Sequence, residues 1–147
     1  MLVQAAPEHA DVLATLHATS FAVPWRSGEF EALLHQPGVA AWIWNAGAPQ
    51  GFILVRAAAD EAEILTLAVA PEHRRHGVAF KLLAHAMDVL RTGGAARMFL
   101  EVAADNTAAS ALYTHHGFTP CGRRTDYYGA ADKMTPVDAV VMKRDLS

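Results

Sequence analysis

One stretch of the sequence, residues 64–103, restricts the fold more than any other. It begins with an apolar run at residues 64–69 and continues through a short basic turn at residues 74–79. A helical pattern follows and stops at the glycine pair 93–94. Its apolar face is formed by Val78, Leu82, Leu83, Ala86, Val89 and Leu90. A second apolar run at residues 97–103 completes the order strand, turn, helix, strand, which is typical of an α/β domain.

The rest of the chain predicts further helices and strands on both sides of this unit. Helices are expected at residues 7–21, 27–34 and 106–116, the second with Ser27 as its cap. Strands are expected at residues 2–5, 39–45, 51–57, 63–69, 118–124 and 138–143. Together these elements predict an α/β (α+β) fold in which about four helices flank a mixed central sheet of about six to seven strands. We expect one domain, residues 1–147.

Composition narrows the class of protein. Hydrophobic residues make up 52% of the chain and charged residues 18%, which indicates a globular protein. The net charge is −3 and no long basic stretch exists, so the sequence does not point to a nucleic acid partner. A single cysteine, Cys121, is typical of a reducing compartment. No secretory signal is recognisable and the apolar runs are too short to cross a membrane, so we expect a cytoplasmic protein.

The basic turn has the chemistry of an anion site. A helix N-terminus carries free N–H groups and a partial positive charge. Gly77 and Ala79 allow a ligand to approach the backbone closely, and Arg74 and Arg75 add full charges. The turn therefore predicts a site for a phosphate or pyrophosphate, although a solvated connection is the plain alternative. A P-loop is excluded because no Gly-Lys-Ser/Thr follows the turn.

Two further residues suggest acid–base chemistry. Glu101 interrupts an apolar run near the C-terminal end of its strand, where ligands bind in open α/β sheets, which makes it a candidate general base. The alternative is a surface glutamate on an edge strand. Tyr113 shares a helical face with Ala109 and Leu112, and on its own it would be read as a core residue. Asn106 is the expected cap of that helix.

Together these pieces resemble the GNAT superfamily of acyl-CoA-dependent N-acetyltransferases. The turn at residues 74–79 fits the family pattern Gln/Arg-x-x-Gly-x-Gly/Ala, and the resemblance covers nearly the whole chain. It is closest to the bacterial RimI-type enzymes, which acetylate the N-terminal alanine of a ribosomal protein. The segments that carry it are residues 21–25, Leu67-Ala68-Val69, Leu100-Glu101-Val102, Asn106 with Ala108-Ala109, Ala111-Leu112-Tyr113, Gly117-Phe118, Arg123-Arg124 before Tyr127-Tyr128, and Asp138-Ala139 before Met142.

The resemblance implies a role for each matching residue. Glu101 would be the general base and Tyr113 the general acid, with no metal ion. Acetyl-CoA would be bound by Leu67, Ala68, Val69, Arg74, Arg75, His76, Gly77, Val78, Ala79, Phe80 and Asn106. Within this set, the strand residues would hold the pantetheine arm and the amides of residues 75–80 the pyrophosphate. One departure is Phe80, which stands where RimI-type proteins often carry arginine.

The acceptor side is expected between residues 21–27 and 125–137. Trp25, Tyr127 and Tyr128 would form its walls, although Trp25 could equally anchor its loop in the core. The expected reaction moves an acetyl group from acetyl-CoA to the α-amino group of a peptide or protein N-terminus, that of a ribosomal protein, by direct attack in a ternary complex. A main-chain N–H near Val69 is the expected donor to the oxyanion.

Other functions stay open at this point. A small-molecule amine or a lysine side chain is the alternative acceptor, and a small cationic amine would use loop carboxylates such as Asp126, Asp132 and Asp138. A CoA-sensing binding module without turnover is a different class, and the presence of both Glu101 and Tyr113 argues against it.

Overall fold

The sheet contains both antiparallel and parallel pairs, as the order of strand and helix patterns predicts. A computed structural model describes residues 1–128 and 137–146, except for the side chains of residues 126–128. Seven strands form one sheet in the order β1-β2-β3-β4-β5-β7-β6. They are β1 (Leu2–Gln4), β2 (Val39–Asn45), β3 (Pro49–Ala58), β4 (Glu61–Val69), β5 (Arg97–Ala103), β6 (Thr119–Tyr128) and β7 (Val137–Asp145).

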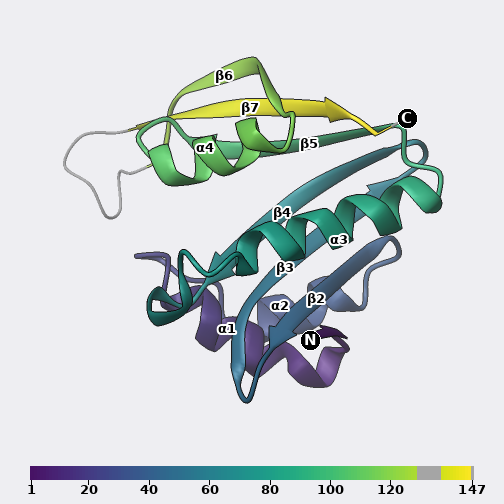
Figure 1. The fold of residues 1–147 in the computed structure, drawn as a ribbon, viewed down its shortest axis with the longest axis vertical. Coiled ribbons are helices and arrows are strands. Elements are labelled where there is room, and N and C mark those ends of the chain that lie inside the picture. The colour runs from purple at the N-terminus through teal and green to yellow at the C-terminus, as the bar shows by residue number, and fades with distance from the viewer. Residues whose placement is uncertain (129–136, 147) are drawn as a thin grey trace.

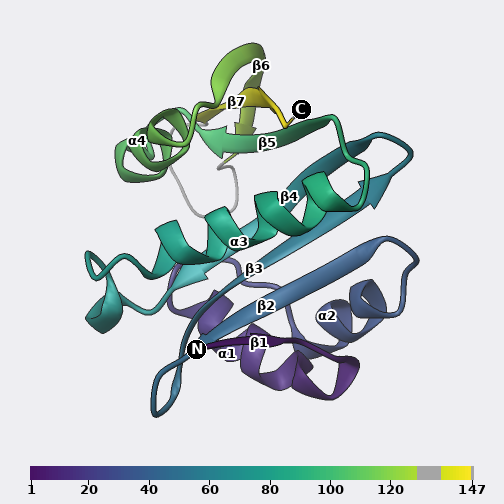
Figure 2. The same ribbon diagram turned by 45° about the vertical axis from the view of Figure 1, so that its right-hand side comes forward.

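Helices cover both faces of this sheet (Figures 1 and 2). The helices are α1 (Ala10–Ala18), α2 (Ser27–Leu34), α3 (Val78–Thr92) and α4 (Thr107–His115), with short 3-10 turns η1 (Pro7–His9) and η2 (Pro71–His73). Two hydrophobic clusters result. One lies on the face covered by α3 and α4 and takes residues from β2, β3, β4, β5 and β7. The other lies on the opposite face, between α1 and α2 and residues of β2, β3 and β4. The periodic apolar face predicted for residues 78–90 is therefore the face that α3 buries, apart from the exposed Val89.

The parallel strands β4 and β5 separate along their length. Their pairing is confined to residues 61–63 of β4 and 97–99 of β5. Beyond these residues the two strands diverge, and α4 and the start of α3 lie near the ends that are apart (Figure 1). The described part of β4 therefore has a neighbouring strand on its β3 side along most of its length, but on its β5 side only at its beginning.

Several predicted boundaries needed correction. Ser27 does not cap α2: it is the first helical residue, and the cap position is Arg26, whose N–H donates to the Glu29 carboxylate at 3.2 Å. Helix α1 ends at Ala18, so Phe21 lies beyond it. Strand β6 continues to Tyr128, past the predicted end at residue 124. The strands predicted at residues 39–45 and 97–103 match β2 and β5 at both ends, and the other predicted elements differ from the structure by at most three residues at either end, as is usual for boundaries read from local pattern.

Candidate active site

The start of α3 presents a row of main-chain donors. Within the described residues, the N–H groups of residues 75–80 donate to no protein acceptor, and Gly77 supplies no side-chain cap. Arg75 has φ +64° and Gly77 has φ +79°, so two left-handed residues bend the chain just before the helix. Such turns gather successive N–H groups into a concave anion site, and the helix dipole adds to the effect. The arrangement supports the predicted phosphate-binding turn.

Backbone strain at Arg75 is the local cost of this shape. A non-glycine residue in the left-handed region is uncommon and costs on the order of 1–3 kcal/mol. At Gly77 an added Cβ would meet no atom within 4 Å, so the position needs glycine for its φ angle and not for space. Strained residues persist where the surrounding structure or a ligand favours them, which is consistent with a binding site here.

At the end of β4, main-chain N–H and C=O groups point toward the side on which β5 no longer pairs with it. The main-chain N–H of Ala70 donates to the carbonyl of Gln50 at 2.9 Å. In an antiparallel pair only every second residue of a strand bonds to the partner strand through its main chain. The N–H and C=O groups of Val69 and Leu67 therefore point away from β3, consistent with the Val69 carbonyl accepting Arg74 Nε at 3.0 Å. These are the groups expected to hold an extended pantetheine arm.

The charge of Arg74 predicts a contact with phosphate, but its guanidinium is hydrogen-bonded to other residues of the protein. Besides the bond to Val69, its Nη2 donates to Ser20 Oγ at 3.0 Å. Its main-chain N–H donates to the Pro71 carbonyl at 3.3 Å. The guanidinium thus joins the turn to the end of β4 and to the residues after α1. A direct contact between Arg74 and a phosphate stays a prediction.

Glu101 lies on β5, which is an interior strand in the sheet order, but at Glu101 the strand pairs with β7 alone because its pairing with β4 ends at Phe99. Its carboxylate pairs with Arg124 Nη2 at 3.0 Å, and the Glu101 side chain is 24% exposed. The register explains the contact: Glu101 is opposite Val141 of β7, Val141 is opposite Gly122 of β6, and Arg124 follows on the same face. The ion pair orients the carboxylate while leaving it open to solvent. Sequence reasoning did not single out this role of Arg124.

Tyr113 lies in α4, and Asn106 is the cap residue just before this helix. Tyr113 is buried in the cluster with α3, and its ring packs edge-on against Phe118 with centroids 5.8 Å apart. Asn106 Oδ1 accepts the N–H of Ala109 at 3.1 Å, which confirms the predicted helix cap. The roles of Tyr113 as general acid and of Asn106 as a cofactor contact stay predictions.

Phe80 is an exposed aromatic residue in the first turn of α3. It keeps 47% of its surface exposed and packs against the His116 ring, centroids 4.3 Å apart. His116 is buried, and desolvation lowers its pKa, with His115 and Arg144 acting in the same direction. The phenyl ring thus joins the start of α3 to the end of α4.

On the acceptor side, Trp25 packs against the core. Its ring lies 5.0 Å from the ring of His17 and 5.5 Å from that of Phe30, centroid to centroid. The main-chain N–H of Trp25 donates to His17 Nδ1 at 3.1 Å. Burial lowers the pKa of His17 to about 4, and the weaker effect of Glu29 opposes this shift. Sequence reasoning missed His17. The available signal was its place four residues after Leu13, on the apolar face of α1.

The remaining acceptor-side residues are only partly described. The side chains of Tyr127 and Tyr128 and residues 129–136, including Asp132, lie outside the described part of the chain, as does the side chain of Asp126. Asp138 is described, and its carboxylate pairs with Arg123. That contact makes it a less available carboxylate for a small cationic acceptor.

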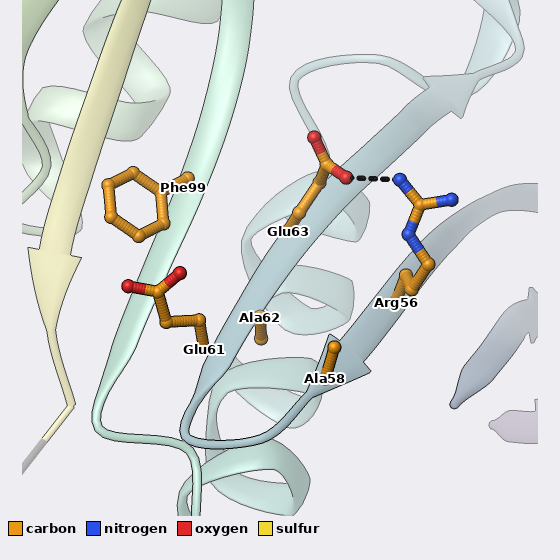
Figure 3. Close-up of a pocket in the computed structure, with 6 residues that line it drawn as sticks. All are labelled: Arg56, Ala58, Glu61, Ala62, Glu63 and Phe99. Atoms are coloured by element: carbon orange, nitrogen blue, oxygen red, sulfur yellow. Dashed lines mark hydrogen bonds and ion pairs between the residues drawn. The ribbon is translucent and has the colours of Figure 1, made fainter. Parts of the chain in front are cut away.

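A hollow of about 250 Å³ lies elsewhere on the sheet, where β4 and β5 are still paired (Figure 3). It is lined by Arg56, Ala58, Glu61, Ala62, Glu63 and Phe99. Glu63 pairs with Arg56 at 2.7 Å, and none of the predicted site residues lines the hollow. Among the described residues there is no group of three or more potential metal ligands. None of the described helices is long and apolar enough to span a membrane.

A family model and a search of curated proteins both identify the chain as similar to acetyltransferases. The acetyltransferase (GNAT) family model matches residues 10–118. The [ribosomal protein bS18]-alanine N-acetyltransferase of Escherichia coli strain K12 is 32% identical over 142 residues, which cover 95% of each chain.

Solved structures agree on the fold. The crystal structure of the ribosomal-protein-S18-alanine N-acetyltransferase from Escherichia coli superposes with a TM-score of 0.89 at 28% identity, covering all of this chain and 95% of that one. Arabidopsis thaliana NAA60 in complex with acetyl-CoA gives a TM-score of 0.83 at 18% identity, covering 99% of this chain and 97% of that one. At that identity the second similarity concerns the fold alone.

Proposed function

Because the chain belongs to the GNAT acetyltransferase family, we propose that it transfers the acetyl group of acetyl-CoA to the N-terminal α-amino group of a protein, the N-terminal alanine of a ribosomal protein. The observation that carries the proposal is the row of N–H groups at residues 75–80, which donate to no acceptor in the described part of the chain and lie beside the diverging end of β4. Similarity to the bS18-alanine N-acetyltransferase over 95% of the chain supports the acceptor class and a cytoplasmic setting.

The binding residues fit acetyl-CoA. The N–H groups of residues 75–80 would hold the pyrophosphate. The outward main-chain groups of Leu67 would pair with the pantetheine amides, and the outward N–H of Val69 would face the thioester end of the arm. Acetyl-CoA supplies the acetyl group as a thioester. The predicted contribution of Asn106 is compatible with its position at the start of α4, although its Oδ1 is already used by the cap.

Three groups of the chain would move or stabilise charge. An N-terminal amine has a pKa of about 7.7–8.0, so much of it is protonated at neutral pH and must lose a proton before it attacks. Glu101, directly or through water, would accept this proton. The outward N–H of Val69 would donate to the oxygen that becomes negative during transfer, and the Tyr113 hydroxyl would give a proton to the departing sulfur.

An α-amino group suits this site better than a lysine side chain does. The lysine amine has a pKa of about 10.4, so its neutral form is scarcer by a factor of several hundred at the same pH. The Glu101 carboxylate is paired with Arg124, and the structure describes no second carboxylate in contact with it. A single base of this kind fits the amine that is easier to deprotonate.

The test is an acceptor screen with acetyl-CoA and a thiol-detecting readout. Peptides that begin with alanine should release thiol and gain 42 Da at the N-terminus, while the same peptides with a blocked N-terminus should not react, even if they contain lysine. Incubation with a ribosomal fraction, followed by mass spectrometry, should identify the acetylated protein. Preference for polyamines or amino sugars would support the small-amine alternative. Binding of acetyl-CoA with no thiol release for any amine tested would leave only a binding module.

A further inference from the structure

Arg74 connects three parts of the molecule that are separate in sequence. It lies between η2 and α3, and its Nε donates to the carbonyl of Val69, the last residue of β4. Its Nη2 donates to Ser20 Oγ, two residues beyond the end of α1. Ser20 Oγ is itself 3.5 Å from the same Val69 carbonyl. The three groups form a closed set of contacts at the end of the sheet.

Ser20 opens the segment that reaches Trp25. The N–H groups of Ser20 and Phe21 both donate to the His17 carbonyl, at 3.0 and 3.2 Å, and the Trp25 N–H donates to His17 Nδ1. Phe21 also stacks on the His17 ring, centroids 4.1 Å apart. His17 therefore holds both ends of this segment, which is expected to form one wall of the acceptor side, and Arg74 holds its Ser20 end through the side chain.

We infer that Arg74 is a positioning residue that couples the acetyl-CoA side of the site to the acceptor side. The inference rests on the proposed function. Binding of a diphosphate to the N–H groups of residues 75–80 would fix the turn that carries Arg74. Binding of the pantetheine arm along Val69 would fix the residue whose carbonyl accepts Arg74 Nε. Arg74 would then hold Ser20, and with it residues 20–25, in the arrangement that receives the acceptor.

The geometry distinguishes this role from a simple phosphate-binding charge. Two guanidinium nitrogens of one planar group meet two different acceptors, a contact that lysine cannot reproduce although it keeps the charge. Coupling of two binding events is reciprocal, so acetyl-CoA should raise acceptor affinity by the same factor as the acceptor raises affinity for acetyl-CoA.

The first test is hydrogen exchange of residues 17–26, followed by mass spectrometry with and without coenzyme A. Each protein is compared at a coenzyme A concentration that saturates it, so a change in affinity does not affect the result. Wild-type protein should exchange more slowly in this segment when coenzyme A is bound. Ser20→Ala, which leaves the turn at residues 74–79 unchanged, and Arg74→Lys should both show little or no such protection. Equal protection in all three proteins, or none in the wild type, would overturn the inference. The experiment needs no acceptor, so it is independent of whether an N-terminal alanine is the true substrate.

The second test uses steady-state kinetics with an alanine peptide. Arg74→Lys and Ser20→Ala should each raise the peptide KM about 5-fold or more, the lower end of typical couplings, with a smaller effect on kcat. The double variant should be no worse than either single variant, because both remove one contact. If Ser20→Ala leaves KM unchanged, Arg74 does not act through Ser20. If wild-type protein acetylates no amine, the proposed function fails separately.

Discussion

At the scale of single residues, Glu101 is the group on which proton transfer depends. Its ion pair with Arg124 and its partial exposure place an oriented carboxylate on the sheet face next to the diverging strands. Glu101→Gln keeps the shape and removes the base. We expect kcat to fall about 10²- to 10⁴-fold while the dissociation constant for acetyl-CoA changes little. Unchanged turnover, measured with an alanine peptide at pH 7.5, would remove Glu101 from the mechanism.

Gly77 allows a sharper test, because a matched control exists. Gly77 and Gly47 both have φ +79° and neither has an atom within 4 Å of an added Cβ, but Gly47 lies in the turn between β2 and β3. Alanine at either position should cost about 1–2 kcal/mol of stability through the left-handed backbone. Only Gly77→Ala should weaken coenzyme A binding, by about 10-fold, as measured by titration calorimetry. Equal affinities for the two variants would place the anion site elsewhere.

At the scale of secondary structure, close packing of β3, β4 and α3 positions the turn. A Cβ on Gly51 would lie 2.9 Å from the Ala68 carbonyl oxygen and 3.2 Å from Val78 Cγ1, so β3 must carry glycine where the start of α3 crosses it. Gly51→Ala should cost about 1–3 kcal/mol in urea unfolding. Gly122→Ala in β6, where an added Cβ makes only ordinary contacts with Val141, is the control and should change stability far less.

The elements also show which features a sequence can predict. The turn at residues 74–79, the helix at 78–92 and the strand at 97–103 were predicted closely because each has a strong local signal of period or glycine placement. The Ser27 cap was wrong because Ser27 is already the first helical residue; the cap position is Arg26, whose main-chain N–H donates to the Glu29 carboxylate. The contacts of Arg74 with Ser20 and of Glu101 with Arg124 join residues far apart in sequence, and no local pattern carries that information.

At the scale of the whole molecule, the buried His17 makes stability depend on pH. Its pKa is about 4 in the fold and about 6.5 when unfolded, so the unfolded chain binds more protons between these values. The contribution of neutral His17 is therefore complete above pH 6.5 and is lost as the pH falls toward 4. His17→Asn keeps an acceptor for the Trp25 N–H and removes this titration. When the pH is lowered from 7.5 to 5.0, the free energy of unfolding of the wild type, measured with urea, should fall by about 2 kcal/mol more than that of the variant. Identical losses would contradict burial of a neutral histidine.

The central claim is that the start of α3 and the outward edge of β4 form one binding site for the diphosphate and pantetheine of coenzyme A. Titration calorimetry of coenzyme A into the purified protein tests it most directly. We predict saturable binding of one ligand per chain, weakened by Gly77→Ala and unaffected by Gly47→Ala. Absence of heat with the wild type at several temperatures, or binding that Gly77→Ala leaves unchanged, would contradict this account.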